Sequence, residues 1–339
     1  MNGAAQLDPH ERDQPVNQTA TATGTDVERS ETSALPPFPS DGIEAGSRVT
    51  LTSLPVDHYG TTVYLKALKH PDAQHAPIVI VHDVGEHADC YERTANAFYE
   101  RGYSVYLFDW RGHGRSGWQL GHAPCFDSLV KDLLQVAAWA RYQENGRAPI
   151  ILGNGLGALV VMEFTKNYAA FCQAVILCAP CLELQPEMTR PHRVLLKLLS
   201  DISPLVRLWS PFSPRLTSHR VSLHPISRED ASLSAKFPGV TAALTYELVQ
   251  AIKRAETRFI EYCGSVLIIC PEKDGICSYK KLKKSAALHD DHNVEIVDLA
   301  NSGHGVFTND DASRELAIKV VLGWLSKLVV GKASASESL

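Results

Sequence analysis

The 339-residue sequence has no run of eighteen or more apolar residues, so no segment is predicted to span a bilayer. Its formal net charge is -5 and it has no dominant basic block, which argues against a nucleic-acid partner. Residues 1–40 are polar, without the apolar centre of a secretory signal or the arginine content of a transit peptide. We therefore expect a cytoplasmic protein.

The sequence also lacks the spacings of metal and cofactor sites. Its histidines do not form an H-E-x-x-H pattern, and Gly153-x-Gly155-x-Gly157 lacks the spacing of a dinucleotide loop. Several of the eight cysteines fall in apolar runs, which indicates reduced core thiols rather than a disulfide framework. The pair Cys178 and Cys181 closes an apolar run instead of opening a helix, unlike a redox motif. We expect no metal and no cofactor.

Short apolar runs that alternate with helical patterns fill most of the chain. This alternation predicts an α/β fold, in which helices flank both faces of a mostly parallel sheet. The expected strands are residues 62–68, 77–81, 104–109, 150–152, 174–178, 266–270 and 294–299. The expected helices are residues 126–144, 156–167 and 313–330.

The pattern divides the chain into a core and a cap. Residues 1–45 have the composition of a disordered leader, and residues 331–339 that of a flexible tail. Residues 46–181 and 258–330 form the expected core, and the proline-rich interval 182–257 forms an expected helical cap, or lid. Its segment Val194–Phe212 is apolar on nearly all sides, so it either packs on its own domain or faces lipid as part of a peripheral membrane contact. Basic residues border the segment at Arg190, Arg193, Lys197 and Arg207.

Residues Ile150–Leu159 (IILGNGLGAL) have the form of a nucleophile elbow without its nucleophile. In the pattern G-x-S-x-G, the flanking glycines let a strand turn sharply into a helix and lift the serine above the sheet. Here Gly153 and Gly157 are the flanks, Asn154 precedes the centre, and the central residue is Gly155.

Two further residues follow in the order expected of a hydrolase triad. Asp274 comes just after one apolar run, and His304 follows the next, before the last helix. The loop after residues 78–81 would supply one backbone N–H of an oxyanion hole, from Val84, and the elbow would supply the other, from Leu156.

The run His82-x-x-Gly85-Glu86-His87, with the later motif Phe108-Asp109-x-Arg111-Gly112-His113-Gly114-x-Ser116-Gly117, resembles the monoacylglycerol lipase and lysophospholipase group of the serine aminopeptidase S33 type. The resemblance implies an α/β-hydrolase fold, hydrolysis of glycerol monoesters or similar esters, and triad roles for Asp274 and His304. The site departs from the family, which has His-Gly where this chain has His82-Asp83, and Gly-His-Ser where it has Gly153-Asn154-Gly155. Ser116 is expected to stabilise a turn.

Three hypotheses follow from the missing serine, and a hydrophobic, lipid-like molecule is the expected ligand. In the first, His304 and Asp274 act as a general base without an acyl-enzyme, with Asp83 as a second acid or base, in a hydrolase, lyase or cyclase. In the second, the protein is a pseudoenzyme that binds a ligand or regulates a partner. In the third, Gly155 was introduced into an active esterase. We also expect glycine to leave a hole beside His304 that holds a water or a substrate atom. The oligomeric state stays open.

Overall fold

The computed structural model describes residues 36–38, 48–185, 187–207, 237–257, 262, 264–287, 293–308 and 311–336. Most of the leader and part of the cap therefore lie outside the described residues. The last helix, α10 (Asp311–Ser336), continues through most of the segment expected to be a flexible tail. No proline interrupts residues 331–336, so the helix can extend beyond the core.

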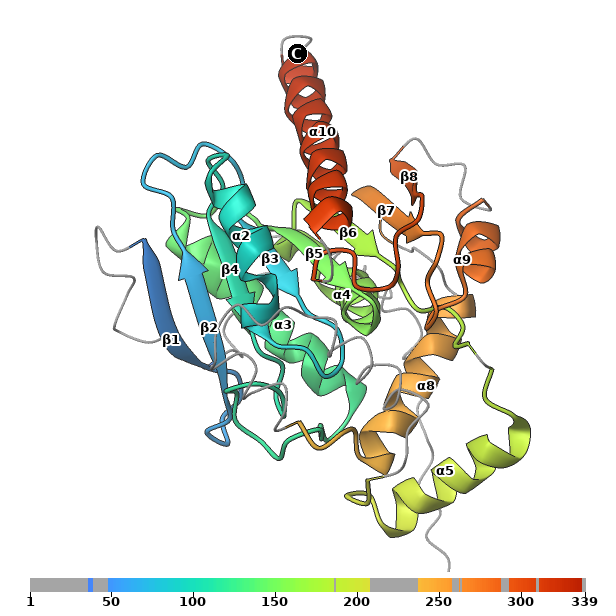
Figure 1. Cartoon of the computed structure of the whole chain (residues 1–339). Helices are drawn as coiled ribbons and strands as arrows, with labels where there is room; N and C mark the ends of the chain where they lie inside the picture. The colour runs from blue at the N-terminus through green and yellow to red at the C-terminus, as the bar shows by residue number, and fades with distance from the viewer. Residues whose placement is uncertain are drawn as a thin grey trace, which may run out of the picture. The chain divides into compact units, whose positions relative to one another are not determined.

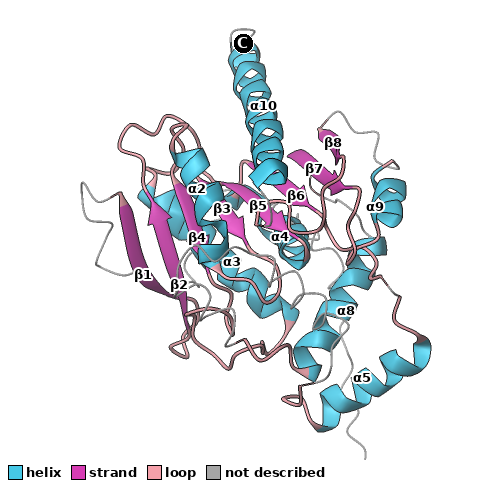
Figure 2. Ribbon diagram, viewed as in Figure 1, coloured by secondary structure: helices cyan, strands magenta, loops and turns pink. Residues whose placement is uncertain are grey.

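The described residues form one eight-stranded sheet with the order β1-β2-β4-β3-β5-β6-β7-β8 (Figures 1 and 2). The strands β3, β4, β5, β6, β7 and β8 pair in parallel, whereas β1 and β2 add an antiparallel edge. The prediction of a mostly parallel sheet is confirmed. The strands are β1 (Val49–Pro55), β2 (Thr62–Leu68), β3 (Ile78–Val81), β4 (Val105–Phe108), β5 (Ile150–Asn154), β6 (Ala174–Cys178), β7 (Ser265–Pro271) and β8 (Val294–Leu299).

Helices cover both faces of this sheet, and each face has its own apolar core. In β3, Val79 and Val81 belong to one core, whereas Ile78 and Ile80 belong to the other, as expected when side chains alternate across a strand. The first core is covered by α3 (Phe126–Gln143), α4 (Leu156–Tyr168), α8 (Ala242–Thr257) and α9 (Tyr279–Ala286). The second is covered by α2 (Glu92–Tyr99) and α10.

The sequence pattern did not predict β1. Its side chains alternate between exposed and partly buried positions, so it lacks the continuous apolar run that marks the central strands. The short helices α2 and α9 were also not predicted, because eight residues give little periodicity.

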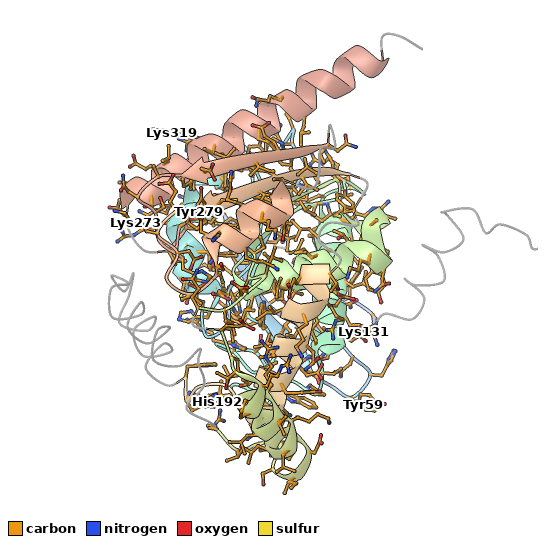
Figure 3. All side chains as sticks on the ribbon, turned by 90° about the vertical axis from the view of Figure 1, so that its right-hand side faces the viewer. Tyr59, Lys131, His192, Lys273, Tyr279 and Lys319 are labelled. Atoms are coloured by element: carbon orange, nitrogen blue, oxygen red, sulfur yellow. The ribbon has the colours of Figure 1, made fainter. Side chains whose placement is uncertain are left out.

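Between β6 and β7 the described chain contributes α5 (Arg190–Ile202) and α8, which pack on each other. Leu196 of α5 is buried, but the side chains of Val194 and Ile202 are 70% and 71% exposed. Helix α5 ends at Ile202, two residues before Pro204, and residues 208–212 of the apolar segment lie outside the described part. Figure 3 labels His192 on α5 and Lys319 on α10, which lie at opposite ends of that view. No helix among the described residues is long and apolar enough to cross a membrane.

Candidate active site

Four loops bring the candidate site residues together at one edge of the sheet. Asp83 follows β3, Gly155 lies between β5 and α4, Asp274 follows β7, and His304 follows β8. All four strands are parallel, so their carboxyl ends meet at the same edge, where ligands bind in folds of this type.

The imidazole of His304 lies between two carboxylates. Its Nδ1 is 2.7 Å from Oδ2 of Asp274, and its Nε2 is 2.7 Å from Oδ2 of Asp83. The second oxygen of Asp274 accepts hydrogen bonds from the N–H groups of Ile276 and Cys277, both at 2.8 Å. The side chains of His304 and Asp83 are only 6% and 3% exposed, so these contacts form in a desolvated site.

The other oxygen of Asp83 occupies the position expected for an oxyanion. Oδ1 accepts a hydrogen bond from the N–H of Val84 at 2.7 Å and one from the N–H of Leu156 at 2.8 Å. Leu156 is the first residue of α4, so the partial positive charge of the helix N-terminus also favours the carboxylate. A side chain of the protein itself therefore fills the two-donor site.

Gly155 makes room for this arrangement. It has φ 57° and ψ -119°, a conformation that side-chain-bearing residues rarely adopt. A Cβ on Gly155 would lie 2.4 Å from Cγ of Asp83, closer than two carbon atoms can approach. The expectation of a hole beside His304 is wrong, because the Asp83 carboxylate occupies that space.

The two carboxylates determine the charge state of the imidazole. Burial alone would lower the pKa of His304, but the charge and hydrogen bond of Asp274, with those of Asp83, raise it well above its ordinary value. Burial likewise acts to raise the pKa of Asp274, but the charge and hydrogen bond of His304 bring it below its ordinary value. Both carboxylates therefore favour the imidazolium form, which can donate one hydrogen bond to each of them.

Two residues hold the backbone of Asp83, and sequence reasoning assigned neither of them a role. Nδ1 of His82 donates to the Asp83 carbonyl at 2.7 Å, while its Nε2 accepts from the N–H of Trp110 at 2.9 Å. Oε2 of Glu86 accepts from the N–H of Asp83 at 3.0 Å and from the hydroxyl of Tyr91 at 2.6 Å. Both residues belong to the His82-to-His87 motif, which was the available signal.

Burial, with the nearby charge of Asp83, raises the pKa of Glu86. This acid can therefore hold a proton at a higher pH than a solvated glutamate, within one hydrogen bond of the Asp83 backbone.

The two flanking glycines of the elbow have structural roles. A Cβ on Gly157 would lie 2.4 Å from the carbonyl oxygen of His82, so only glycine lets α4 approach β3 this closely. Gly153 similarly lies against the backbone of Ala158. The side chain of Asn154 is fully buried, and neither of its amide atoms has a hydrogen-bond partner among the described residues.

Ser116 lies in a turn and takes no part in the relay, the hydrogen-bonded chain of Asp274, His304 and Asp83. Its hydroxyl donates to the carbonyl of Asp109 at 2.5 Å and accepts from the N–H of Tyr64 at 2.8 Å. The hydroxyl therefore both donates and accepts a hydrogen bond, and these two bonds join the turn to β2.

Asp274, Cys277 and His304 offer three potential metal-ligand atoms within 4.8 Å of one another. Asp274 and His304 already bond to each other at 2.7 Å, and burial raises the pKa of the Cys277 thiol well above its ordinary value. A metal would need a neutral imidazole and a thiolate. The donor set therefore fits the hydrogen-bonded relay better than a metal centre.

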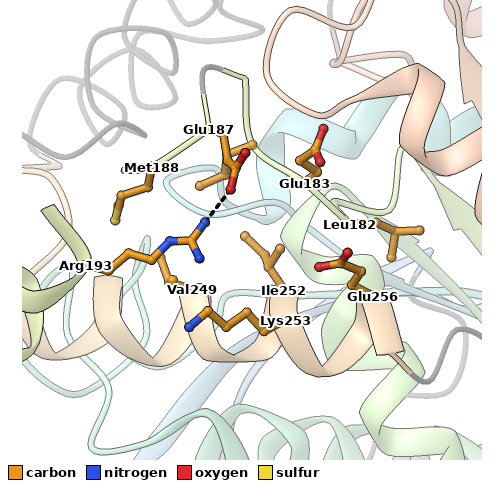
Figure 4. Close-up of a pocket in the computed structure, with 10 residues that line it drawn as sticks. Leu182, Glu183, Glu187, Met188, Arg193, Val249, Ile252, Lys253 and Glu256 are labelled. Carbon is orange, nitrogen blue, oxygen red and sulfur yellow. Dashed lines mark hydrogen bonds and ion pairs between the residues drawn. The ribbon is translucent and has the colours of Figure 1, made fainter. Parts of the chain in front are cut away.

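A separate cavity of about 130 Å³ lies between α5, α8 and the segment that leads from β6 into the cap (Figure 4). It is lined by Leu182, Glu183, Leu184, Glu187, Met188, Arg193, Val249, Ile252, Lys253 and Glu256. Arg193 pairs with Glu187 across it at 2.7 Å. None of the relay residues lines this cavity.

The sheet order, the turn at Gly155 and the positions of Asp274 and His304 define an α/β-hydrolase. The family profile described as serine aminopeptidase S33 matches residues 72–311, and the chain belongs to that family.

Several relatives and solved structures similar to this chain are named as monoacylglycerol or monoglyceride lipases. The monoacylglycerol lipase of Mycolicibacterium smegmatis is 25% identical over 212 residues, which cover 57% of this chain and 74% of the relative. The crystal structure of a monoacylglycerol lipase from Paleococcus ferrophilus has a TM-score of 0.63 at 21% identity, covering 78% of this chain and 98% of that one. A soluble variant of monoglyceride lipase from Saccharomyces cerevisiae has a TM-score of 0.68 at 16% identity, covering 86% of this chain and 98% of that one.

Proposed function

We propose that this protein receives a hydrophobic, acyl-like ligand in a monoacylglycerol lipase fold but does not hydrolyse it through a serine acyl-enzyme. One observation carries the proposal: the Asp83 carboxylate takes both oxyanion donors and the nucleophile position beside His304. An ester carbonyl would have to displace a charged group that accepts three hydrogen bonds. Gly155 also offers no hydroxyl to acylate.

The ligand class follows from the family and from the apolar residues of the cap. The monoacylglycerol lipase of Mycolicibacterium smegmatis is 25% identical over 57% of this chain, and this likeness supports a similar class of ligand. The exposed apolar side chains of α5 support a contact with lipid at a membrane surface, from which such a ligand would enter.

The test is to restore the serine in two ways. We would measure labelling by a fluorophosphonate and hydrolysis of a short p-nitrophenyl ester by the unaltered protein, by Gly155→Ser and by the double variant Asp83→Gly/Gly155→Ser. We expect the unaltered protein and Gly155→Ser to stay inactive, because Asp83 still fills the site. The double variant should label and turn over, since its oxyanion donors are free.

The controls decide between this proposal and its alternatives. Asp83→Gly alone should neither be labelled by the fluorophosphonate nor hydrolyse the ester, because it has no serine. Labelling of Gly155→Ser as strong as that of the double variant would contradict the proposal and would favour an introduced Ser-to-Gly change. Ester turnover by the unaltered protein that disappears in His304→Gln would favour noncovalent general-base chemistry instead.

A further inference from the structure

The Asp83 carboxylate has the surroundings of an activated nucleophile. A nucleophile is recognised by a base within hydrogen-bond reach, a third group that orients that base, and donors for a developing oxyanion. Around Asp83, His304 at 2.7 Å is the group that can serve as base once it has lost its proton, and Asp274 orients that imidazole from 2.7 Å. The donors are two backbone N–H groups.

We propose that Asp83 is a carboxylate nucleophile that displaces halide from a primary alkyl halide, forming an alkyl ester that water then hydrolyses. The inference rests on the proposed function in one respect, namely that Asp83 replaces serine at the reactive position. It goes beyond that function by naming another reaction and another class of substrate.

The electrophile follows from the chemistry of a carboxylate. Attack on an acyl ester would give an anhydride, which reverts because a carboxylate leaves more readily than an alkoxide. Attack on a saturated carbon gives a stable ester. The displaced group departs on the side opposite Oδ2, away from His304, so His304 cannot protonate it and a group that leaves without a proton is favoured. Halide meets that condition, whereas the oxygen of an epoxide would need an acid on the far side.

In the first step, Oδ2 of Asp83 forms a bond to the alkyl carbon as the carbon–halogen bond breaks and halide leaves with the electron pair. Asp83 becomes neutral, so one of the two charges that favour the imidazolium of His304 disappears. His304 then releases its proton to solvent and becomes the base that the second step needs.

In the second step, His304 takes a proton from water as the hydroxide adds to Cγ of Asp83. Negative charge develops on Oδ1, which already accepts the N–H groups of Val84 and Leu156 at 2.7 and 2.8 Å. The alkyl oxygen leaves with the proton of His304, and the new carboxylic acid returns a proton to the imidazole. The sum is alkyl halide and water giving alcohol, halide and one proton.

The most direct test is a single turnover of 1-bromobutane with excess unaltered protein in ¹⁸O water, followed by mass spectrometry of the peptide that contains Asp83. We expect ¹⁸O in the Asp83 carboxylate and unlabelled oxygen in the butanol. Direct attack of water would place ¹⁸O in the butanol, and that result would overturn the proposal. Absence of bromide release above the rate of the Asp83→Asn variant would overturn it as well.

Variants provide a second readout. His304→Gln should keep the butyl group on Asp83, because it lacks the base, and its butanol formation should fall roughly 10²- to 10⁴-fold. Asp83→Asn should gain no butyl group, whereas the exposed control Asp127→Asn should behave as the unaltered protein does. If His304→Gln does not fold, the ¹⁸O experiment still decides. Fluorophosphonate labelling of the unaltered protein would contradict the proposed function but would leave these butyl measurements to be judged separately.

Discussion

Oδ2 of Asp83 lies 2.7 Å from Nε2 of His304, where a serine hydrolase has its serine hydroxyl. The same carboxylate is 2.4 Å from the position that a Cβ on Gly155 would occupy. Of the three departures from the family, aspartate for glycine at 83 and glycine for serine at 155 therefore fit together as an exchange, because the Asp83 side chain needs the space that Gly155 leaves. The polar side chain next to His304 therefore comes from Asp83 in the loop after β3, and not from the elbow residue Gly155.

This exchange predicts a strong coupling between positions 83 and 155. Gly155→Ala should lower the free energy of unfolding by more than the ~1–3 kcal/mol that unfavourable backbone conformations cost, because its Cβ also clashes with Asp83. In an Asp83→Gly background the loss should be smaller. Urea denaturation of the four proteins measures the coupling.

Gly146→Ala is the matched control for that cycle. Gly146 has φ 85°, but a Cβ there would meet no atom within 4 Å, so it isolates the backbone effect. Equal losses for Gly155→Ala and Gly146→Ala, with no coupling to Asp83, would contradict the exchange.

The sequence was sufficient to predict the sheet because its central strands are buried on both faces and read as continuous apolar runs, such as Ile78–Val81. The sequence also indicated that Asp83, Asp274 and His304 each follow a strand, and the structure places them at the carboxyl ends of β3, β7 and β8. It could not show where the Asp83 side chain points, because that depends on the N–H of Leu156, which lies 73 positions away in the chain.

The half-exposed edge strand β1 could not be predicted for a related reason. Whether an alternating segment forms a strand depends on the neighbouring strand it packs against, and the sequence pattern does not identify that strand. From the sequence, Gly155 is interpreted as the loss of a nucleophile. In the structure, the Asp83 carboxylate occupies the space that a side chain at 155 would need.

His304 should contribute strongly to stability as the cation between two buried carboxylates. His304→Gln should lower the free energy of unfolding by roughly 3–5 kcal/mol, since removing one partner leaves buried charge uncompensated. Urea denaturation at pH 7 measures the loss, with the exposed His58→Gln as control. A loss as small as that of the control would mean that the imidazole is not charged in the folded protein.

The pH dependence of stability should have two limits. The raised pKa of His304 gives a contribution that is complete below its unfolded value near 6.5 and is lost as pH rises through the folded value. The lowered pKa of Asp274 gives a contribution present above about 3.8 and lost as pH falls through its folded value.

We therefore expect the advantage of the unaltered protein over His304→Gln to be greatest between these limits and to shrink in alkaline buffer. Thermal denaturation from pH 6 to pH 10 measures it. An advantage that grows with rising pH would have the wrong sign for an imidazolium.

The exposed apolar face of α5 should bind lipid. Replacing Val194 and Ile202 by serine removes two side chains that are 70% and 71% exposed, so it should weaken binding to vesicles without altering the core. Co-sedimentation with phosphatidylcholine vesicles containing monoacylglycerol measures this. Tyr59→Ser, which changes a residue that is 94% exposed outside the cap, is the control. Equal binding by all three proteins would assign the α5 face another role.

The central claim is that His304 is an imidazolium held between Asp83 and Asp274, and nuclear magnetic resonance of the His304 ring tests it most directly. With ¹⁵N-labelled histidine, the account predicts that both ring nitrogens carry strongly hydrogen-bonded protons at pH 7. It also predicts that Asp83→Asn shifts the titration of His304 to lower pH. A neutral ring at pH 7 in the unaltered protein, with one unprotonated nitrogen and a titration unchanged by Asp83→Asn, would contradict the account.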